Sequence, residues 1–420
     1  MTDAVLTGMT PPYGRPGTET GDATGGGTGD GAVRFEAGRG ALIGLLLTNM
    51  LLNLLTLGLY RFWARTRVRR FFWGALRIDG RPLDYTGRGM ELFLGFLVAL
   101  VLLAPVLAVF QFVANVLTLT HPVAGVTVTL LFYPLLGALA LTGAYFARRY
   151  LLTRTRWSGI AAGQDGTAVR FVGLHLWAYL LATLSLGIAM PWADAKTYRY
   201  RMSITRFGTG RFGSDADSRG LWGAWLAAWG LLALGTVLWA VGFTPALETM
   251  EEQQAGVPPT PLDLNDGLLA VAVLLYAAGL LALAFYRLVR FRHFTRHTWL
   301  EGIRFRCDAP VRAFIGVIAV TALLLLGVAG LAALAGIGIA MLIPTPMGVV
   351  VGGAVALLLL LAATPLVTTG YYLPALLTRL AAHGRITGLS AADAIVNRAA
   401  PAPRRGEGLI DAVGDIGIGL

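Results

Sequence analysis

Six long apolar stretches constrain this chain more than any other feature. They cover residues 92–114, 123–147, 221–243, 267–286, 313–343 and 347–373, and none contains Asp, Glu, Lys or Arg. Each is long enough to cross roughly 30 Å of hydrocarbon as a helix. Hydrophobic residues make up 56% of the 420 residues. The sequence therefore predicts an all-α polytopic membrane protein with about six to eight transmembrane or re-entrant helices and small cytoplasmic β-hairpins.

A shorter apolar segment, residues 41–60, ends in a distinctive stretch. Gly58 can take the left-handed backbone conformation that ends a helix and turns the chain. Trp63, a residue typical of the membrane interface, follows it. The next basic residues are Arg65, Arg67, Arg69 and Arg70. The stretch is interpreted as a turn at the edge of the membrane.

The same pattern returns 129 positions later. Leu57-Gly58 matches Leu186-Gly187, and Trp63 matches Trp192, which follows Pro191. Aligned tryptophans and glycines at one spacing indicate an internal repeat. We divide the membrane region accordingly into unit 34–171, unit 172–310 and a C-terminal helix pair at 311–374.

At these residues the chain resembles the YjgN-like bacterial inner-membrane proteins, a family built on a domain of unknown function. The resemblance is carried by TLGLY at 56–60, WA at 63–64, the basic run into FF at 71–72, LG at 186–187 and PWA at 191–193, and it extends faintly to the tail, GEGLIDAVGDIGIGL. Phe62 stands where the family usually has the proline that the second copy keeps as Pro191, which leaves the geometry of the first turn open. The resemblance implies an inner-membrane location and no known activity.

The net charge of +11 is concentrated in the loops between helix pairs. Positive loops stay in the cytoplasm, so these loops and both termini are predicted to be cytoplasmic. Anionic lipid headgroups, and not nucleic acid, are the expected partners; the candidate side chains are Arg65, Arg67, Arg69, Arg70, Arg199 and Arg201. Residues 173–192 have basic loops at both ends. That segment and residues 41–60 are either re-entrant or ordinary spans.

Outside the membrane region we expect little independent structure. Residues 1–33 are rich in Gly and Thr and are predicted to be disordered, and residues 375–420 are predicted to be a cytoplasmic tail. Asp79-Gly80 predicts the turn of a hairpin over 71–85. Arg149-Tyr150, Arg199-Tyr200 and Arg290-Phe291 are interpreted as the starts of similar hairpins, which would pair into a small sheet or lie on the membrane.

Few residues suggest chemistry. Asn49 and Asn53 lie one helical turn apart in an apolar segment, where they either join helices or line a wet cavity. His293 and His297 have the spacing of a metal-ligand pair but no third ligand, so an ordinary role is favoured. Glu91 and Asp194 are expected to pair with Arg88 and Lys196. No catalytic motif, cofactor or metal site is predicted.

Two functions remain open from the sequence, and the oligomeric state is not indicated. One is transport of a small or lipid-like solute, which the repeat and the re-entrant segments favour. The other is a non-catalytic scaffold that organises anionic lipid or an envelope complex. The absence of charge within the spans favours the second, or a passive pathway. Cys307 lies among arginines, so it is expected on the cytoplasmic side as a thiol for labelling.

Overall fold

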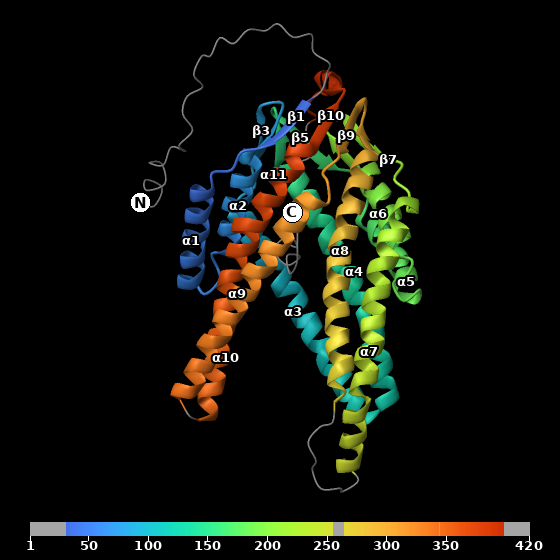
Figure 1. The fold of residues 1–420 in the computed structure, drawn as a ribbon. Coiled ribbons are helices and arrows are strands. Elements are labelled where there is room, and N and C mark those ends of the chain that lie inside the picture. Colours follow the sequence, from blue (N-terminus) through green and yellow to red (C-terminus); the bar gives the residue numbers. More distant parts are fainter. Residues whose placement is uncertain (1–30, 255–263, 344, 399–420) are drawn as a thin grey trace.

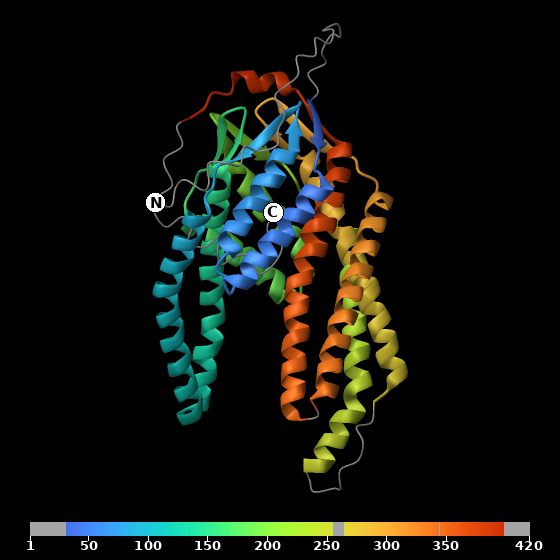
Figure 2. The ribbon, with the colours of Figure 1, turned by 90° about the vertical axis from the view of Figure 1, so that its left-hand side faces the viewer.

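The computed structural model describes residues 31–254, 264–343 and 345–398. Ten short strands gather at one end of the molecule, and long helix pairs extend away from them and spread apart (Figures 1 and 2). Six of the helical segments are long and apolar enough to cross a membrane, and their bounds are Gly89–Thr120, Pro122–Arg154, Arg219–Glu251, Asp266–Arg296, Arg312–Leu342 and Pro346–His383. The predicted multi-pass helical membrane protein is confirmed at this level.

The strands form one closed antiparallel barrel, which corrects the expectation of an all-α protein with small hairpins that pair into a small sheet or lie on the membrane. Their bounds are β1 Gly31–Phe35, β2 Leu76–Ile78, β3 Arg81–Tyr85, β4 Thr155–Trp157, β5 Ile160–Gln164, β6 Thr205–Phe207, β7 Gly210–Ser214, β8 Thr298–Leu300, β9 Ile303–Cys307 and β10 Gly384–Thr387. Sequential strands are neighbours, and β1 pairs with both β2 and β10. Closure satisfies every strand edge, which hairpins this short cannot do alone.

The helices connect the strands in pairs. Their bounds are α1 Arg39–Leu55, α2 Arg61–Ala75, α3 Gly89–Thr120, α4 Pro122–Arg154, α5 Ala168–Leu184, α6 Met190–Ser203, α7 Trp222–Gln254, α8 Asp266–Arg296, α9 Arg312–Leu342, α10 Pro346–Val367 and α11 Leu373–His383, with a 3₁₀ turn η1 at Arg219–Leu221 and a π-helical segment η2 at Thr368–Tyr372. Each five-residue strand leads into a helix pair, and the pair returns to a strand of three or four residues. Five such units follow one another, and four tight turns join them. The fifth junction is the pairing of β10 with β1, so the two ends of the described chain close the ring.

Several local predictions are corrected by this arrangement. Phe71 to Ala75 belong to α2, so the first hairpin begins only at Leu76. The Asp79-Gly80 turn is as predicted, with φ of 51° and 75°, which a type I′ turn requires. The other basic-aromatic pairs lie in α4, α6 and α8 and not in strands.

The predicted tails are also shorter than expected. Residues 31–33, assigned to a disordered tail, are part of β1, and residues 375–387, assigned to a cytoplasmic tail, form the end of α11 and all of β10. Residues 1–30 and 399–420 lie outside the described part of the chain.

Alternation along the strands gives the barrel an apolar interior and a basic exterior. Val33 pairs with Ile78, and the next residues, Arg34 and Arg77, pair on the opposite face. Val33, Ile78, Phe207, Leu300 and Ile386 meet in one apolar cluster, although they come from different parts of the ring. The barrel is therefore filled with side chains, as small barrels are.

The arginines of the exterior face form a belt around the barrel. The belt consists of Arg34, Arg77, Arg156, Arg206, Arg211, Arg304, Arg306 and Arg385. A 3₁₀ turn η3, Leu389–Ala394, lies over the hairpin turns, and Ile395 joins the interior cluster. This segment covers the end of the barrel that faces away from the helices (Figure 2).

Threonines at the starts of strands join successive units. Thr155 accepts a hydrogen bond from Trp73 Nε1 at 3.0 Å, and Thr205 accepts one from Arg148 at 2.7 Å. Thr298 Oγ1 is 2.8 Å from Tyr198 Oη. In each case the partner lies on the last helix of the preceding unit. These bonds fix the helices against the barrel at its helix-facing end.

Candidate functional site

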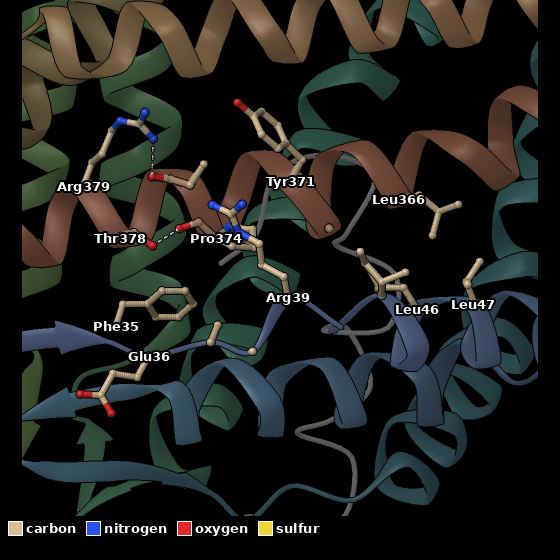
Figure 3. A pocket seen from close by; sticks show the side chains of 15 residues that line it. Phe35, Glu36, Arg39, Leu46, Leu47, Leu366, Tyr371, Pro374, Thr378 and Arg379 are labelled. Carbon is tan, nitrogen blue, oxygen red and sulfur yellow. Dashed lines mark hydrogen bonds between the residues drawn. The ribbon is translucent and has the colours of Figure 1, made fainter. Parts of the chain in front are cut away.

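A groove lies between the start of α1 and the segment formed by the end of α10, η2 and α11. Its volume is about 930 Å³, and Figure 3 shows the side chains that line it. They are Phe35, Glu36, Ala37, Gly38, Arg39, Ile43, Leu46, Leu47, Leu366, Gly370, Tyr371, Pro374, Ala375, Thr378 and Arg379. The groove is thus formed where the first and last units of the ring meet.

The local sequence explains why the groove exists. Pro365 lies inside α10, and Pro374 lies in the first turn of α11. Proline lacks a backbone N–H, so it interrupts the regular helical hydrogen bonds. The five residues of η2, 368–372, form a π-helix between the two prolines. Such π segments occur frequently at functional sites. A Cβ at Gly370 would lie 3.2 Å from Leu46 Cδ1, so glycine lets α1 approach here.

The groove has an apolar end and a cationic end. Leu46, Leu47 and Leu366 lie toward one end, while Arg379 and Glu36 lie toward the barrel (Figure 3). Arg39 extends across the space toward Pro374. This order of groups matches an amphiphile with an anionic head and a hydrocarbon tail.

The charge at the polar end is positive. Glu36 is 3.1 Å from Arg77 Nε, so its carboxylate is already neutralised by the barrel. Arg379 donates to the carbonyl of Ala375 at 3.2 Å. Within the described ranges Arg39 has no hydrogen-bond or ion-pair partner. The guanidinium of Arg39 is consequently available to an anion.

The two predicted glycine turns have the same geometry. Gly58 and Gly187 have φ of 87° and 88°, and the preceding leucines, Leu57 and Leu186, also have positive φ, at 50° and 53°. Gly58 N donates to Asn53 O, and Gly187 N donates to Ala182 O, each at 2.7 Å. These bonds close the C-terminus of α1 and of α5 in a Schellman motif. The replacement of Pro191 by Phe62 therefore leaves the turn unchanged.

The residues after the turns pack differently in the two copies. Trp63 stacks on Tyr60 and also contacts Phe93, while Trp192 lies beneath the ammonium of Lys196 at 4.7 Å. Pro191 is in the first turn of α6 and is buried. Both tryptophans are half-buried, as expected for interfacial residues.

The predicted headgroup arginines separate into exposed and buried groups. Arg67, Arg70 and Arg199 are exposed. Arg69 is buried and donates to the hydroxyl of Tyr85 at 3.4 Å, so it faces the protein and not the surface. Arg65 and Arg201 are half-buried. Sequence position alone could not separate the exposed arginines from the buried ones, because neighbouring residues of a helix point in different directions around its axis.

Asn49 joins two helices. Its side chain donates to Ala64 O at 3.4 Å and accepts from Arg67 at 3.3 Å, so it links α1 to α2. Asn53 Oδ1 is buried without a partner among the described residues. The helix-packing role thus fits Asn49.

Two carboxylates have longer-range partners than expected. Glu91 accepts from Tyr150 at 2.7 Å and from Arg154 at 2.9 Å, and not from Arg88. Asp194 accepts from Tyr286 and from Arg290, each at 2.7 Å, and not from Lys196. In both cases the tyrosine precedes the arginine by one helical turn. This spacing, Tyr-x-x-x-Arg, is the sequence signal that could have identified the partners of both carboxylates.

The second of these networks borders a smaller groove of about 460 Å³ between α6 and the pair α7–α8. Met190, Asp194, Trp225, Leu283, Tyr286, Arg287 and Arg290 line it. The carboxylate of Asp194 already accepts hydrogen bonds from two donors. The network therefore holds α6 against α8. His293 Nε2 is 2.9 Å from Asp217 O, and in the described ranges no three potential metal-ligand side chains gather.

Cys307 is not the accessible thiol that we expected. Its side chain packs against Phe314 and Ala309, and the residue is 3% exposed. Burial raises the pKa of its thiol, which further lowers reactivity, because the thiolate is the reactive form. Labelling experiments therefore need introduced cysteines.

The groove residues Arg39, Tyr371 and Arg379 were missed by the sequence reading. Arg39 is a single arginine at the start of a helix, and Arg379 lies in a region expected to be a tail. The one local signal was the run Thr368 to Tyr372 between two prolines, which is unusual in a membrane helix.

Comparisons with known proteins give the family but no relative of known function. A search of curated proteins and a search of solved structures found no match. The model of a family described as "Bacterial protein of unknown function (DUF898)" matches residues 30–412. These residues include every strand and helix described above. The chain therefore belongs to this bacterial family, of which the YjgN-like proteins are members.

Proposed function

We propose that this protein is a non-catalytic inner-membrane protein that binds an anionic, lipid-like amphiphile in the groove between α1 and η2–α11. The observation that carries the proposal is the position of Arg39, a guanidinium without a partner among the described residues, at the polar end of a groove whose other end is apolar. Arg379 adds a second positive charge at the same end. A phosphate or carboxylate head would pair with these groups while its tail lies against Leu46, Leu47 and Leu366.

The barrel faces the cytoplasm in this proposal. Its exterior carries the arginine belt, whereas Glu248 and Glu251 lie at the far end of α7. Positive charge is retained on the cytoplasmic side during insertion. The belt would then lie close to the anionic headgroups of the inner leaflet, where each basic residue contributes about 1 kcal/mol to membrane association.

The pairs α1–α2 and α5–α6 enter the membrane and return to the same side. Both ends of each pair connect to the barrel, and α1 and α5 have 17 residues, against 31 or more in the six long segments. Their tips are apolar: Leu57 is 94% exposed and Leu186 is 80% exposed. A leucine in a left-handed conformation is strained. An exposed leucine in this conformation at both tips is explained if the tips insert into hydrocarbon.

Labelling of introduced cysteines tests this topology. With Cys307 replaced by Ser, single cysteines at Ser158 and Ser203, both exposed on the barrel side of the molecule, are expected to react with an impermeant thiol reagent only after the membrane is opened. A cysteine at Leu186 should react poorly in both conditions, because hydrocarbon excludes the reagent. Reaction at Leu186 from outside intact cells would mean that the pair crosses the membrane.

The lipid site is tested by removing its charges. Arg39→Gln with Arg379→Gln is expected to lower the amount of anionic lipid that remains bound after purification by tenfold or more, since each hydrogen bond to a charged group contributes about 1.5–3 kcal/mol. Native mass spectrometry in neutral detergent measures the bound lipid. Arg398→Gln, which removes an exposed arginine outside both the groove and the arginine belt, is the matched control and should retain it. Equal retention in the groove variant and the control would contradict the site.

Transport of a lipid-like solute is the second candidate. The two short helix pairs have identical turns 129 positions apart, and such recurrences are common in transporters. The filled and covered barrel offers no route along its own axis, so a transported amphiphile would move along the helix surfaces. Flux of fluorescent phosphatidylglycerol in reconstituted vesicles separates the candidates: flux that Arg39→Gln abolishes favours transport, and binding without flux favours a scaffold.

A further inference from the structure

A second cationic site lies at the end of the barrel that faces the helices, away from the groove. We call it the mouth cluster, and it consists of Arg148, Gln164, Tyr198, Arg201 and Thr205. Arg148 comes from α4, whereas the other four come from α6 and from strands β5 and β6. The cluster therefore forms only when the second and third units of the ring meet.

Arg148 is held in a fixed position by neutral acceptors. It donates to Gln164 Oε1 at 2.9 Å and to Thr205 Oγ1 at 2.7 Å. Gln164 and Thr205 are directly opposite each other in the β5–β6 ladder, and both are 5% exposed. A guanidinium has five N–H donors, of which these bonds use two. The rest of the group remains able to bind a planar or tetrahedral oxyanion.

The cluster carries a second cation and further unused donors. Arg201 is close enough to Arg148 for the two like charges to repel each other. It lies over the ring of Tyr198, and its buried Nε atom has no partner in the described part of the chain. Gln164 Nε2 is likewise buried and without a partner there. Two neighbouring cations in a water-poor site are costly unless an anion lies with them.

Three other arginines that are buried or half-buried show the contrast. Arg154 pairs with Glu91, Arg206 pairs with Asp165, and Arg290 pairs with Asp194. Among the described residues, no carboxylate pairs with Arg148 or Arg201. Each of those three arginines therefore has a carboxylate partner, whereas the arginines of the mouth cluster have none among the described residues.

We propose that the mouth cluster binds a phosphate-type oxyanion, with Arg148 and Arg201 as the charged ligands and Gln164 Nε2 as a neutral donor. The anion is either free inorganic phosphate or the headgroup of an anionic phospholipid, since both present the same oxygen atoms. Binding there joins the second unit to the third, because the ligands come from both. The site is independent of the groove at α1.

Thermal unfolding of the purified full-length protein in neutral detergent tests the proposal. Sodium phosphate is expected to raise the unfolding temperature of the wild-type protein relative to sodium chloride at equal ionic strength. Gln164→Glu places a carboxylate beside Arg148, so this variant should resist heat without phosphate and should gain nothing from its addition. Arg201→Gln should weaken phosphate binding at least about tenfold, measured by titration calorimetry. Arg398→Gln, an exposed change outside the arginine belt, should respond as the wild type does.

The outcomes distinguish the two sources of phosphate. Protection by free phosphate that Gln164→Glu abolishes supports an inorganic anion. The ligand is a lipid headgroup if phosphatidylglycerol stabilises the wild type against heat, phosphate does not, and Gln164→Glu abolishes the effect. The proposal is overturned if neither ligand stabilises the wild type, or if Gln164→Glu and Arg201→Gln respond to phosphate as the wild type does. If Gln164→Glu does not fold, the phosphate affinity of Arg201→Gln tests the proposal in its place. Loss of lipid binding in Arg39→Gln leaves all of these results unchanged, so the two sites can fail separately.

Discussion

Replacing Gly58 and Gly187 together by valine is expected to remove most of the correctly folded protein. Both glycines have φ near +90°, a conformation that side chains with a β-carbon rarely adopt and that is most unfavourable for β-branched residues. Each strained residue costs about 1–3 kcal/mol. The two turns are in different helix pairs, so their costs should add to roughly 2–6 kcal/mol. That is a large part of the ~5–15 kcal/mol by which domains are stable.

The controls for this experiment lie in the same helix pairs. Gly44 in α1 and Gly173 in α5 have no atom within 4 Å of the place where a Cβ would be, and neither has a positive φ. Gly44→Val with Gly173→Val should therefore leave the yield close to that of the wild type. Size-exclusion chromatography of a fluorescent fusion in detergent measures the monodisperse fraction. Similar losses in both double variants would show that the turns do not depend on left-handed glycine.

Ile386→Asp is expected to prevent closure of the barrel. Ile386 is 5% exposed and lies opposite Gly31 of β1 and Phe305 of β9. The change removes a buried aliphatic side chain, which contributes about 1.5–3 kcal/mol, and it puts an unpaired carboxylate into an apolar interior at several kcal/mol more. Because β10 joins the last unit to the first, losing it would leave two strand edges open at once.

The adjacent residue provides a control of the same chemistry. Arg385 lies on the exterior face, where it is exposed and opposite Arg306. Arg385→Asp introduces the same carboxylate beside an arginine, and opposite charges across a strand pair are mildly favourable. We expect near-normal yield and resistance to trypsin for Arg385→Asp and rapid digestion for Ile386→Asp. Equal digestion of the two variants would mean that the faces of β10 are not assigned correctly.

Much of the helical structure could be predicted because it depends on local sequence. A charge-free stretch such as 92–114 has one stable conformation in hydrocarbon, where every backbone group must find its partner within the helix. The turn at Gly58 was also predictable, because few residues other than glycine tolerate a positive φ. Asp79-Gly80 gave a tight hairpin for the same reason.

The site was less predictable, because its residues are brought together from distant parts of the chain. Arg39 and Arg379 meet only after the first and last units are adjacent in the ring. Glu91 and Asp194 were assigned to arginine or lysine neighbours in sequence, but the structure offers Tyr150 and Tyr286 with a second donor one turn away. Nearness along the chain is a poor guide when a helix more than thirty residues long separates the partners.

The sequence alone determined that the chain is a membrane protein of several helices, where those helices lie and where two of the turns occur. Those properties follow from hydropathy and from backbone sterics, which act over a few residues. Only the tertiary structure decided that strands of three to five residues close into one barrel, with β1 and β10 joining its ends. Strands this short have no periodicity that can be read, and their pairing is stable only when all edges are satisfied together. Ring closure also decided which arginines face solvent and which are buried, because the two faces of a strand differ only once the barrel has an inside.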